Sequence, residues 1–209
     1  MSEEIAAVSI KTHNVTLREG DVTLRPMTEG DWDLLLRWNQ DPEILYFTEG
    51  VEGRSYDLEI VHRIYRGVSQ NAYCFIIEYK GEQIGECWLQ KMNLERIIKK
   101  YPGKDCRRID IMIGEKDLWG HGIGSRVITM LAEFGFMKEK ADIIVADAYE
   151  DNVRSIKAAR NAGFEADGRY DDMPFGTSHY SIDMVLTKEK SKQLRERGRG
   201  PEREDGNDA

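Results

Sequence analysis

Long apolar runs, paired cysteines and a surplus of positive charge are all missing from this sequence of 209 residues. No apolar stretch approaches the ~20 residues that a membrane-spanning helix needs. The opening residues 1–10 lack the basic start and the apolar block of a signal peptide. Only three cysteines occur and none lies in a CxxC pair, which is typical of free thiols in a reducing cytoplasm. We therefore predict a cytoplasmic protein and exclude a membrane protein, a disulfide-bonded secreted scaffold and a zinc finger.

The charge balance is acidic, with 38 Asp and Glu residues against 30 Lys and Arg residues and a net charge of −8. Phosphate-rich partners require clustered positive charge, so we expect neither nucleic acid nor an anionic membrane surface as a partner. An acidic protein has room instead for a cationic ligand. We expect no metal site, because the four histidines show no ligand spacing; they are His13, His62, His121 and His179.

The C-terminal residues 188–209 differ in composition from the rest of the chain. They hold seven basic and six acidic residues, and their only apolar side chains are those of Leu194 and Ala209. Such a segment buries too little apolar surface to order itself. We therefore predict a single domain over residues 1–187, followed by a frayed helix end and a disordered tail that contributes little to stability.

Strand and helix patterns alternate through the body of the chain. In the first half they predict a hairpin, two helices and a second hairpin, at 15–25, 28–38, 55–68 and 73–90. Pro42 is expected to forbid continuation of the first helix, and 91–106 to be a loop with one helical turn. In the second half they predict strand, helix, strand, helix and two strands, at 107–113, 123–138, 143–148, 152–162, 165–170 and 178–186. A strand–helix–strand crossover beside antiparallel neighbours predicts an α/β fold with a mixed sheet.

Three glycines alternate with other residues between a predicted strand and a long predicted helix, in the segment Trp119, Gly120, His121, Gly122, Ile123, Gly124 and Ser125. Glycine lets the backbone approach a ligand without a Cβ in the way. A helix start directs unpaired N–H groups at an anion. The combination predicts a pyrophosphate site, although no Walker-type lysine follows. Taken alone, the segment is equally compatible with glycines that relieve tight packing.

A second segment, from Asp151 to Phe164, has the sequence DNVRSIKAARNAGF. Together the two segments resemble the GNAT superfamily of acetyl-CoA-dependent N-acetyltransferases, which carry a Gly-x-Gly pyrophosphate loop and a later Asn-x-x-Ala/Ser helix ending in Gly-Phe. The resemblance is closer still to the aminoglycoside 6′-N-acetyltransferases and covers residues 22–187. Its other matching segments are VTLRPMT at 22–28, IIEY at 76–79, IG at 84–85 and RIDIMIG at 108–114.

The resemblance implies a GNAT fold, with acetyl-CoA as the co-substrate bound by the glycine segment. In this reaction an amine attacks the thioester carbonyl and forms a tetrahedral oxyanion. The resemblance places the backbone N–H that stabilises this oxyanion near Met112 and Ile113, because a bulged or splayed strand leaves such a donor free. It also implies that Asn152 hydrogen-bonds the pantetheine arm, a role that is compatible with a helix N-cap.

Acidic residues are implied for the acceptor amine. Strand alternation separates Asp110 from the apolar face of its strand. We interpret Asp110 as the catalytic residue that anchors the ammonium and passes its proton to water, because a carboxyl with a pKa near ~3.9 is a poor base for an amine near ~10. The alternative is a structural ion pair with Arg107 or Arg108. Glu49 and Asp147 match the acceptor side of the family and are predicted to bind the substrate.

One position departs from the family pattern. Many members have a tyrosine in the second helix as the acid for the departing thiolate, where this chain has Ala159. A thiol has a pKa near ~8.5, so the thiolate can leave and take a proton from water. Tyr170 and Tyr180 are candidates for a spatial substitute.

The acceptor and the oligomeric state stay open at this point. The favoured acceptor is the 6′-amine of an aminoglycoside, a small cationic amine. The alternatives are a polyamine, a hydroxylated lysine of siderophore synthesis and a protein N-terminus, because fold alone does not name a substrate. A third reading is a catalytically weak acyl-CoA-binding module, supported by Ala159. A homodimer is compatible with the sequence, which does not define the oligomeric state.

Overall fold

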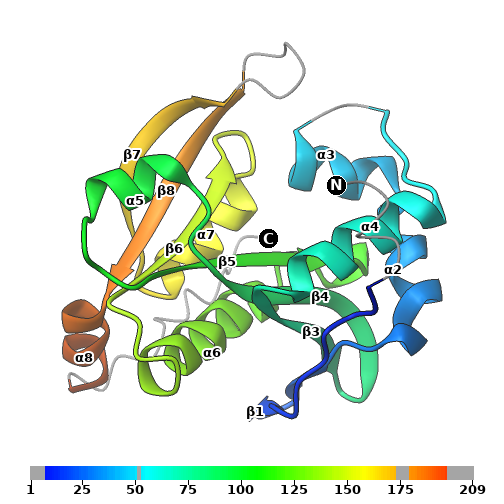
Figure 1. The fold of residues 1–209 in the computed structure, drawn as a ribbon, viewed down its shortest axis with the longest axis horizontal. Helices are drawn as coiled ribbons and strands as arrows, with labels where there is room; N and C mark the ends of the chain where they lie inside the picture. The colour runs from blue at the N-terminus through cyan, green and yellow to red at the C-terminus, as the bar shows by residue number, and fades with distance from the viewer. Residues whose placement is uncertain (1–7, 51–52, 173–178, 197–209) are drawn as a thin grey trace, which may run out of the picture.

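The chain forms one mixed sheet of eight described strands (Figure 1). The structure is a computed structural model that describes residues 8–50, 53–172 and 179–196. The strands are β1 Leu17–Glu19, β2 Val22–Pro26, β3 Ala72–Tyr79, β4 Glu82–Lys91, β5 Cys106–Ile113, β6 Ile143–Tyr149, β7 Glu165–Asp172 and β8 His179–Thr187. Their order across the sheet is β1-β2-β3-β4-β5-β6-β8-β7, and all neighbours are antiparallel except β5 and β6. The predicted α/β class with a mixed sheet is confirmed.

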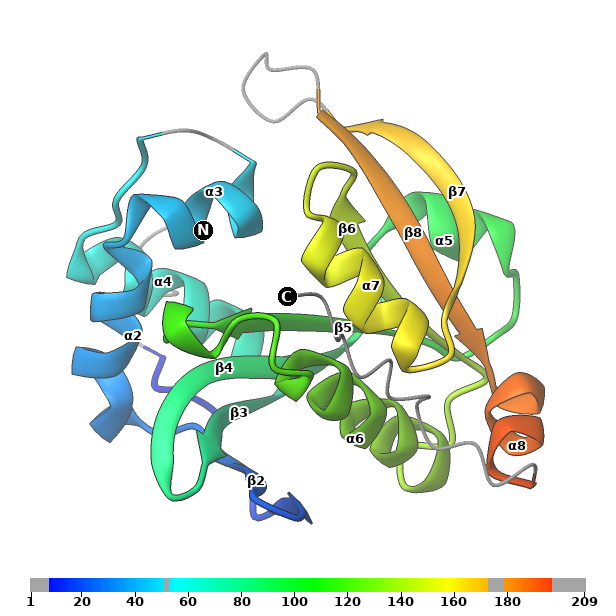
Figure 2. The same ribbon diagram turned by 180° about the vertical axis from the view of Figure 1, so that it is seen from behind.

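Helices cover both faces of the sheet (Figure 2). The helical segments are η1 Glu29–Asp31, α2 Trp32–Asn39, α3 Pro42–Glu49, α4 Leu58–Ser69, α5 Glu95–Lys100, η2 Lys116–Leu118, α6 Ile123–Met137, α7 Val153–Asn161 and α8 Lys188–Glu196. On one face α6 packs against β5 and α7 against β6 and β8, and on the other α2 packs on α4, which contacts β3. Within the described ranges, no helix has the length and apolar character that crossing a bilayer requires.

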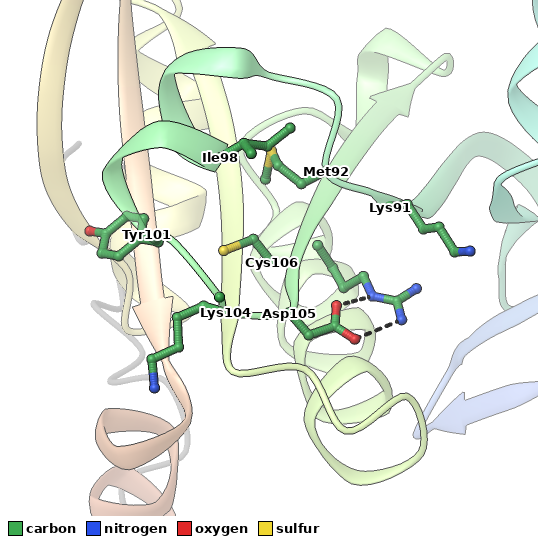
Figure 3. A pocket seen from close by; sticks show the side chains of 9 residues that line it. Lys91, Met92, Ile98, Tyr101, Lys104, Asp105 and Cys106 are labelled. Atoms are coloured by element: carbon green, nitrogen blue, oxygen red, sulfur yellow. Dashed lines mark hydrogen bonds and ion pairs between the residues drawn. The ribbon is translucent and has the colours of Figure 1, made fainter.

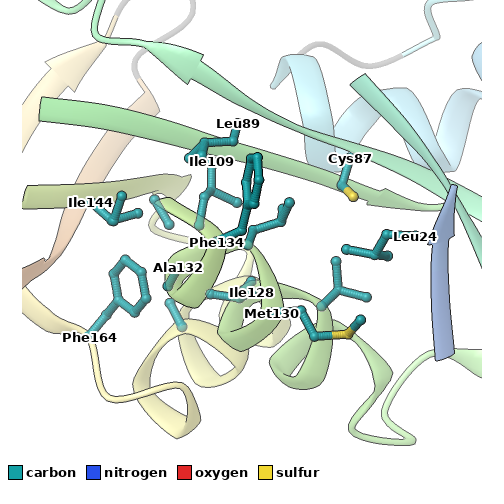
Figure 4. Packing of buried hydrophobic residues seen from close by; sticks show 14 of the residues in the cluster. Leu24, Cys87, Leu89, Ile109, Ile128, Met130, Ala132, Phe134, Ile144 and Phe164 are labelled. Atoms are coloured by element: carbon teal, nitrogen blue, oxygen red, sulfur yellow. The ribbon is translucent and has the colours of Figure 1, made fainter. Parts of the chain in front are cut away.

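Three apolar clusters fill the space between these helices and the sheet, two large ones and a smaller one that joins Ile97 of α5 to β5, β6 and β8. The larger cluster lies on the α6 side and contains Ile109, with Ile111 and Ile113 packed against it (Figure 4). Met112 belongs instead to the second cluster, together with Trp38 of α2. The predicted alternation along β5 is therefore confirmed, and it places the Asp110 side chain on the face of the second cluster.

The helices of the N-terminal third begin at capping residues. Thr28 and Asp31 form the predicted capping box, in which each side chain accepts the backbone N–H of the other. Pro42 does more than end a helix, because it is the first residue of α3, which the sequence analysis did not predict. A proline has no N–H to lose at the first position of a helix. Asp41 caps this helix by accepting N–H groups of its first turn.

The other predicted elements are present, with shifts at their ends. The two predicted hairpins are β1–β2 and β3–β4, and the single helical turn within 91–106 is α5. The helix expected from Ser55 begins only at Leu58, because Asp57 caps it and accepts the N–H of Ile60 at 2.8 Å. Local capping chemistry, rather than apolar spacing, sets this boundary.

The C-terminal helix α8 is attached to the core. Leu194 packs against the larger apolar cluster, and Ser191 is buried. Leu194 also covers the end of α7, since a Cβ on Gly163 would lie 2.4 Å from its Cδ1 atom. The predicted helix end is thus present as α8, with a core contact through Leu194 that the charged composition did not indicate, and its small contribution to stability stays a prediction. Residues 197–209, the rest of the predicted tail, lie outside the described residues.

Strands β5 and β6 pair at one end only and then diverge (Figure 2). Their parallel register runs from Cys106 opposite Ile143 to Arg108 opposite Val145 and continues no further, although β5 extends to Ile113. Beyond Arg108, the edge of β5 that faces β6 therefore has no partner strand among the described residues. This divergence creates the position at which a ligand can meet backbone groups of β5.

Gly114 directly after β5 permits a close approach between the sheet and α2. A Cβ at this position would lie 2.2 Å from the indole of Trp38, which is 1% exposed. We expect Gly114→Ala to lower the free energy of unfolding by about 1–3 kcal/mol, because the buried ring must move. Gly67→Ala in α4 is the matched control, since a Cβ there meets no described atom within 4 Å and alanine favours a helix. Urea unfolding of both variants checks this, and equal stabilities would contradict it.

Candidate active site

The glycine segment between β5 and α6 has the geometry of an anion site. Gly120 and Gly122 have φ values of +81° and +74°, which favour glycine, and a Cβ on either would meet no described atom within 4 Å. α6 starts at Ile123 with no side-chain cap and no acidic residue in its first turn. Its first N–H groups are therefore available to a phosphate. These residues fit the pyrophosphate of acetyl-CoA.

Arg154 adds a positive charge beside this loop that the sequence analysis missed. Its guanidinium carbon lies 4.2 Å from the ring centroid of Trp119 and 4.4 Å from that of Phe47. Trp119 is itself fixed by a hydrogen bond from Nε1 to the carbonyl of Ile113 at 2.7 Å. The exposed His121 contacts the Trp119 carbonyl at 3.0 Å. The loop is thus tied to the end of β5, and its neighbour Arg154 comes from the first turn of α7.

Asn152 is the N-cap of α7. Its Oδ1 accepts the N–H of Ser155 at 3.1 Å, and its Nδ2 donates to the carbonyl of Phe47 at 3.2 Å. The N-cap reading is confirmed, whereas the contact with a pantetheine arm stays a prediction. The second hydrogen bond joins α7 to α3, and Tyr149 strengthens this link by donating its hydroxyl to the Glu49 carbonyl at 3.2 Å.

Met112 and Ile113 lie on the diverging part of β5. The register between β4 and β5 is regular from Gly85 opposite Ile113 to Lys91 opposite Arg107, so β5 is splayed from β6 rather than bulged. Met112 is 5% exposed. An oxyanion-stabilising N–H in this stretch remains a prediction, and the splay is the structural condition for it.

Asp110 sits in a polar setting built by β4 and β5. Its Oδ2 accepts from Trp88 Nε1 at 2.8 Å and from Gln90 Nε2 at 3.2 Å, while its Oδ1 accepts from Arg108 Nη2 at 2.8 Å. Removal from water raises the pKa of Asp110 to about 6, with a further rise from the charge of Asp147, against the lowering effect of Arg108. Asp110 is therefore a weaker acid than usual, and the predicted ion pair with Arg108 is present.

Two of the three acids predicted for the acceptor lie against Arg108. Asp110 Oδ1 lies 2.8 Å from Arg108 Nη2, and Asp147 of β6 has its Oδ1 2.8 Å from Arg108 Nε. Burial raises the pKa of the third, Glu49 at the end of α3, and a hydrogen bond with Tyr56 and the charges of Arg54 and Arg108 partly offset the rise. Arg107, the other predicted partner of Asp110, pairs instead with Asp105, whose Oδ1 lies 2.7 Å from Arg107 Nε. Arg108 is thus the centre of the site, a place that the sequence analysis did not give it.

A buried carboxyl on β4 extends the polar row behind Asp110. Glu86 is 3% exposed, and its Oε1 accepts from the hydroxyl of Tyr65 at 3.3 Å. Burial raises the pKa of Glu86 well above its usual range, and the charge of Asp110 adds to this. Tyr65 also accepts from the amide of Asn39 at 2.9 Å. The only sequence signal for Glu86 is a lone acid in an alternating strand.

The candidates for protonating the thiolate lie elsewhere. Ala159 is 2% exposed and packs in the larger apolar cluster. Tyr170 of β7 lies under the Arg96 guanidinium at 4.9 Å, and Tyr180 of β8 lies under that of Arg169 at 3.3 Å. Both strands are beyond β6, on the side away from β5. A role for either tyrosine stays a prediction.

A cavity of about 420 Å³ opens at the other end of β5 (Figure 3). It lies where β5 begins, and its walls include Cys106, Tyr101 and the ion pair of Arg107 with Asp105. Burial raises the pKa of the Cys106 thiol, so the thiol is less reactive than an exposed one. The lining contains none of the residues predicted for the acceptor or for acetyl-CoA.

Known proteins resemble this chain in sequence and in fold. The family description "Acetyltransferase (GNAT) domain" matches residues 21–165. The chain belongs to this family. Aminoglycoside N(6′)-acetyltransferase type 1 from Klebsiella pneumoniae is 26% identical over 185 residues, covering 87% of this chain and 90% of that protein. The resemblance inferred from the sequence motifs, the GNAT fold and an enzymatic activity are thereby confirmed, and the protein is a GNAT-type acetyltransferase dependent on acetyl-CoA.

Two solved GNAT structures are similar in fold. Aminoglycoside acetyltransferase AAC(6′)-Ib in complex with coenzyme A and kanamycin has a TM-score of 0.66 and 24% identity, over 83% of this chain and 99% of that chain. Spermidine N-acetyltransferase from Vibrio cholerae, in complex with CoA and spermine, has a TM-score of 0.68 and 17% identity, with the same coverage of 83% and 99%.

Proposed function

We propose that this GNAT acetyltransferase acetylates a primary amine of a small polycationic molecule, the 6′-amine of an aminoglycoside. The observation that carries the proposal is the pair of carboxylates on the two diverging strands. Asp110 on β5 and Asp147 on β6 each lie 2.8 Å from the same guanidinium, that of Arg108. A site that already holds one cation between two strands is suited to the ammonium of an acceptor.

Each residue has a distinct task in this reaction. Asp110 anchors the ammonium and passes its proton to water, because even a pKa of about 6 is too low to deprotonate an alkylammonium directly. Acetyl-CoA supplies the thioester carbonyl that the free amine attacks. Backbone N–H groups near Met112 and Ile113 stabilise the oxyanion. Gly120, Gly122 and the start of α6 hold the pyrophosphate, and Asn152 contacts the pantetheine arm.

The names of the similar proteins support a cationic acceptor. The relative from Klebsiella pneumoniae is named for the aminoglycoside 6′-amine, and one structural neighbour binds kanamycin. Another neighbour binds spermine, which makes a polyamine the second candidate. A cytoplasmic location is a further part of the proposal and rests on the sequence.

The test is a turnover assay with acetyl-CoA and three acceptor classes. Kanamycin or tobramycin, spermidine and a short peptide are each incubated with the full chain, and thiol release is followed. We expect turnover of the aminoglycoside, with NMR placing the acetyl group on the 6′-nitrogen. A drug carrying a hydroxyl in place of the 6′-amine should not react. Rapid turnover of spermidine or peptide, with none on any aminoglycoside, would falsify the acceptor while leaving the acetyltransferase standing.

A further inference from the structure

Arg108 occupies the point where β5 and β6 separate. It is the last residue of β5 that pairs with β6, opposite Val145. Its side chain is 21% exposed and lies within 2.8 Å of both Asp110 and Asp147. Its charge also acts on Glu49. One internal cation is therefore shared by Asp110 and Asp147, two of the three acids predicted for the acceptor.

The contact between Arg108 and Asp147 leaves hydrogen-bonding capacity unused. Arg108 Nε and Asp147 Oδ1 are 2.8 Å apart, yet both atoms are buried and neither makes a hydrogen bond within the described structure. The N–H is thus poorly aligned with the carboxylate. A carboxylate has about four lone-pair sites, so Asp147 can accept from an ammonium without losing its ion pair.

The charges at this point leave a small negative excess. Two carboxylates, those of Asp110 and Asp147, contact the guanidinium of Arg108, and its charge also acts on the carboxylate of Glu49. Arg96 is shared between two carboxylates, because its Nη2 lies 2.8 Å from Oδ1 of the buried Asp183 of β8 and 4.0 Å from Oδ2 of Asp147.

Arg54 also acts on Glu49 and donates to the hydroxyl of Tyr56 at 3.3 Å. When the charges of Arg108 and Arg54 are set against the three carboxylates of Glu49, Asp110 and Asp147, at most one negative charge remains.

We propose that Arg108 is a specificity-determining residue that limits how many positive charges the acceptor brings into this site. It fills one cation position between Asp110 and Asp147, so that a single ammonium group balances the remainder. A further ammonium would face the guanidinium and be repelled. This inference rests on the proposed transfer to an amine and defines the acceptor class of that site.

The experiment compares amines that carry from one to four positive charges, drawn from those that the wild type acetylates. Arg108→Gln keeps an amide that can still donate to Asp110 but removes the charge. We expect kcat/KM for amines of three and four charges to rise about tenfold relative to amines of one or two charges. The salt dependence for the highly charged amines should become steeper, because an additional carboxylate charge attracts them.

Arg107→Gln is the matched control, because Arg107 neighbours Arg108 on the same strand but pairs with Asp105 and Glu139. It should keep the wild-type ranking of amines. An equal fall of kcat/KM for every amine in Arg108→Gln, or an unchanged ranking, would overturn the proposal. Calorimetry with the same amines gives the ranking independently of turnover.

Two further measurements test the proposal in case Arg108→Gln does not fold. Arg108→Lys retains the charge and must retain the wild-type ranking. The wild type itself must favour amines of four charges over amines of two by less than about tenfold at low salt, and a steeper preference overturns the proposal. Failure of the wild type to acetylate aminoglycosides is a separate result, since the amine series does not depend on them.

Discussion

Asp110→Asn is expected to lower kcat/KM by about a hundredfold or more, or ~3 kcal/mol of transition-state stabilisation. The substitution keeps the shape of the side chain and removes the charge that holds the acceptor's ammonium. Arg108 retains a second carboxylate, that of Asp147, so we expect the variant to stay folded. The loss should therefore appear in turnover and not in the affinity for acetyl-CoA.

The pH profile provides a second test of the same residue. Because the pKa of Asp110 is raised to about 6, the carboxyl is neutral below that pH and cannot bind an ammonium. Wild-type kcat/KM should therefore fall as the pH drops through about 6, and the variant should lack this limb. Stability changes in the opposite direction, because a folded-state pKa above the unfolded value near ~3.9 means that protonation between pH 4 and 6 favours the folded state.

Kinetics and thermal unfolding of matched variants distinguish a role of Asp110 in binding the amine from a purely structural ion pair. Asp105→Asn is the control, since Asp105 lies just before β5 and pairs with Arg107 rather than Arg108. It should leave kcat/KM near the wild-type value. If Asp110→Asn unfolds, or keeps the full rate, then Asp110 serves as a structural ion-pair partner and the amine is held elsewhere.

The predictable parts of the fold are those set by local chemistry. Alternation along β5 and the Thr28–Asp31 capping box involve neighbours in sequence, and both are found as predicted. The helix α3 was missed because Pro42 was interpreted only as a helix breaker, although a proline at the first helical position is favourable. The contact of Leu194 with the core was also not predictable, because a single apolar side chain in a charged segment gives no periodic pattern.

In the candidate active site, the acidic residues could be predicted from the sequence, but the arginine between them could not. The family motifs indicated Glu49, Asp110 and Asp147, and the fold brings Asp110 and Asp147 to one guanidinium. This shared cation was not predictable, because Arg108 contacts Asp147 across the divergence of two strands, and its charge acts on Glu49, which lies 59 positions earlier in the chain. Alternation along a strand indicates which face a residue occupies, but not which side chains reach that face from other elements.

Gly122→Asp is expected to abolish acetyl-CoA binding, with an affinity loss of about a hundredfold or more. Gly122 is the residue before α6 and has a φ of +74°, so an aspartate there strains the backbone by about 1–2 kcal/mol. The larger effect is electrostatic. The carboxylate stands where the start of α6 would meet the pyrophosphate, and it repels the phosphates while competing for the same N–H groups.

Two variants distinguish the effect of the aspartate's negative charge from the effect of backbone strain at position 122. Gly103→Asp has the same left-handed backbone, with a φ of +75° and no described atom within 4 Å of a Cβ, but lies at the other end of β5. It should bind acetyl-CoA as the wild type does. Gly122→Asn meets the same left-handed backbone as Gly122→Asp but carries no charge, so its affinity should fall between those of the wild type and Gly122→Asp. Calorimetry on folded protein measures all three. An unchanged dissociation constant for Gly122→Asp would mean that the pyrophosphate binds away from the start of α6.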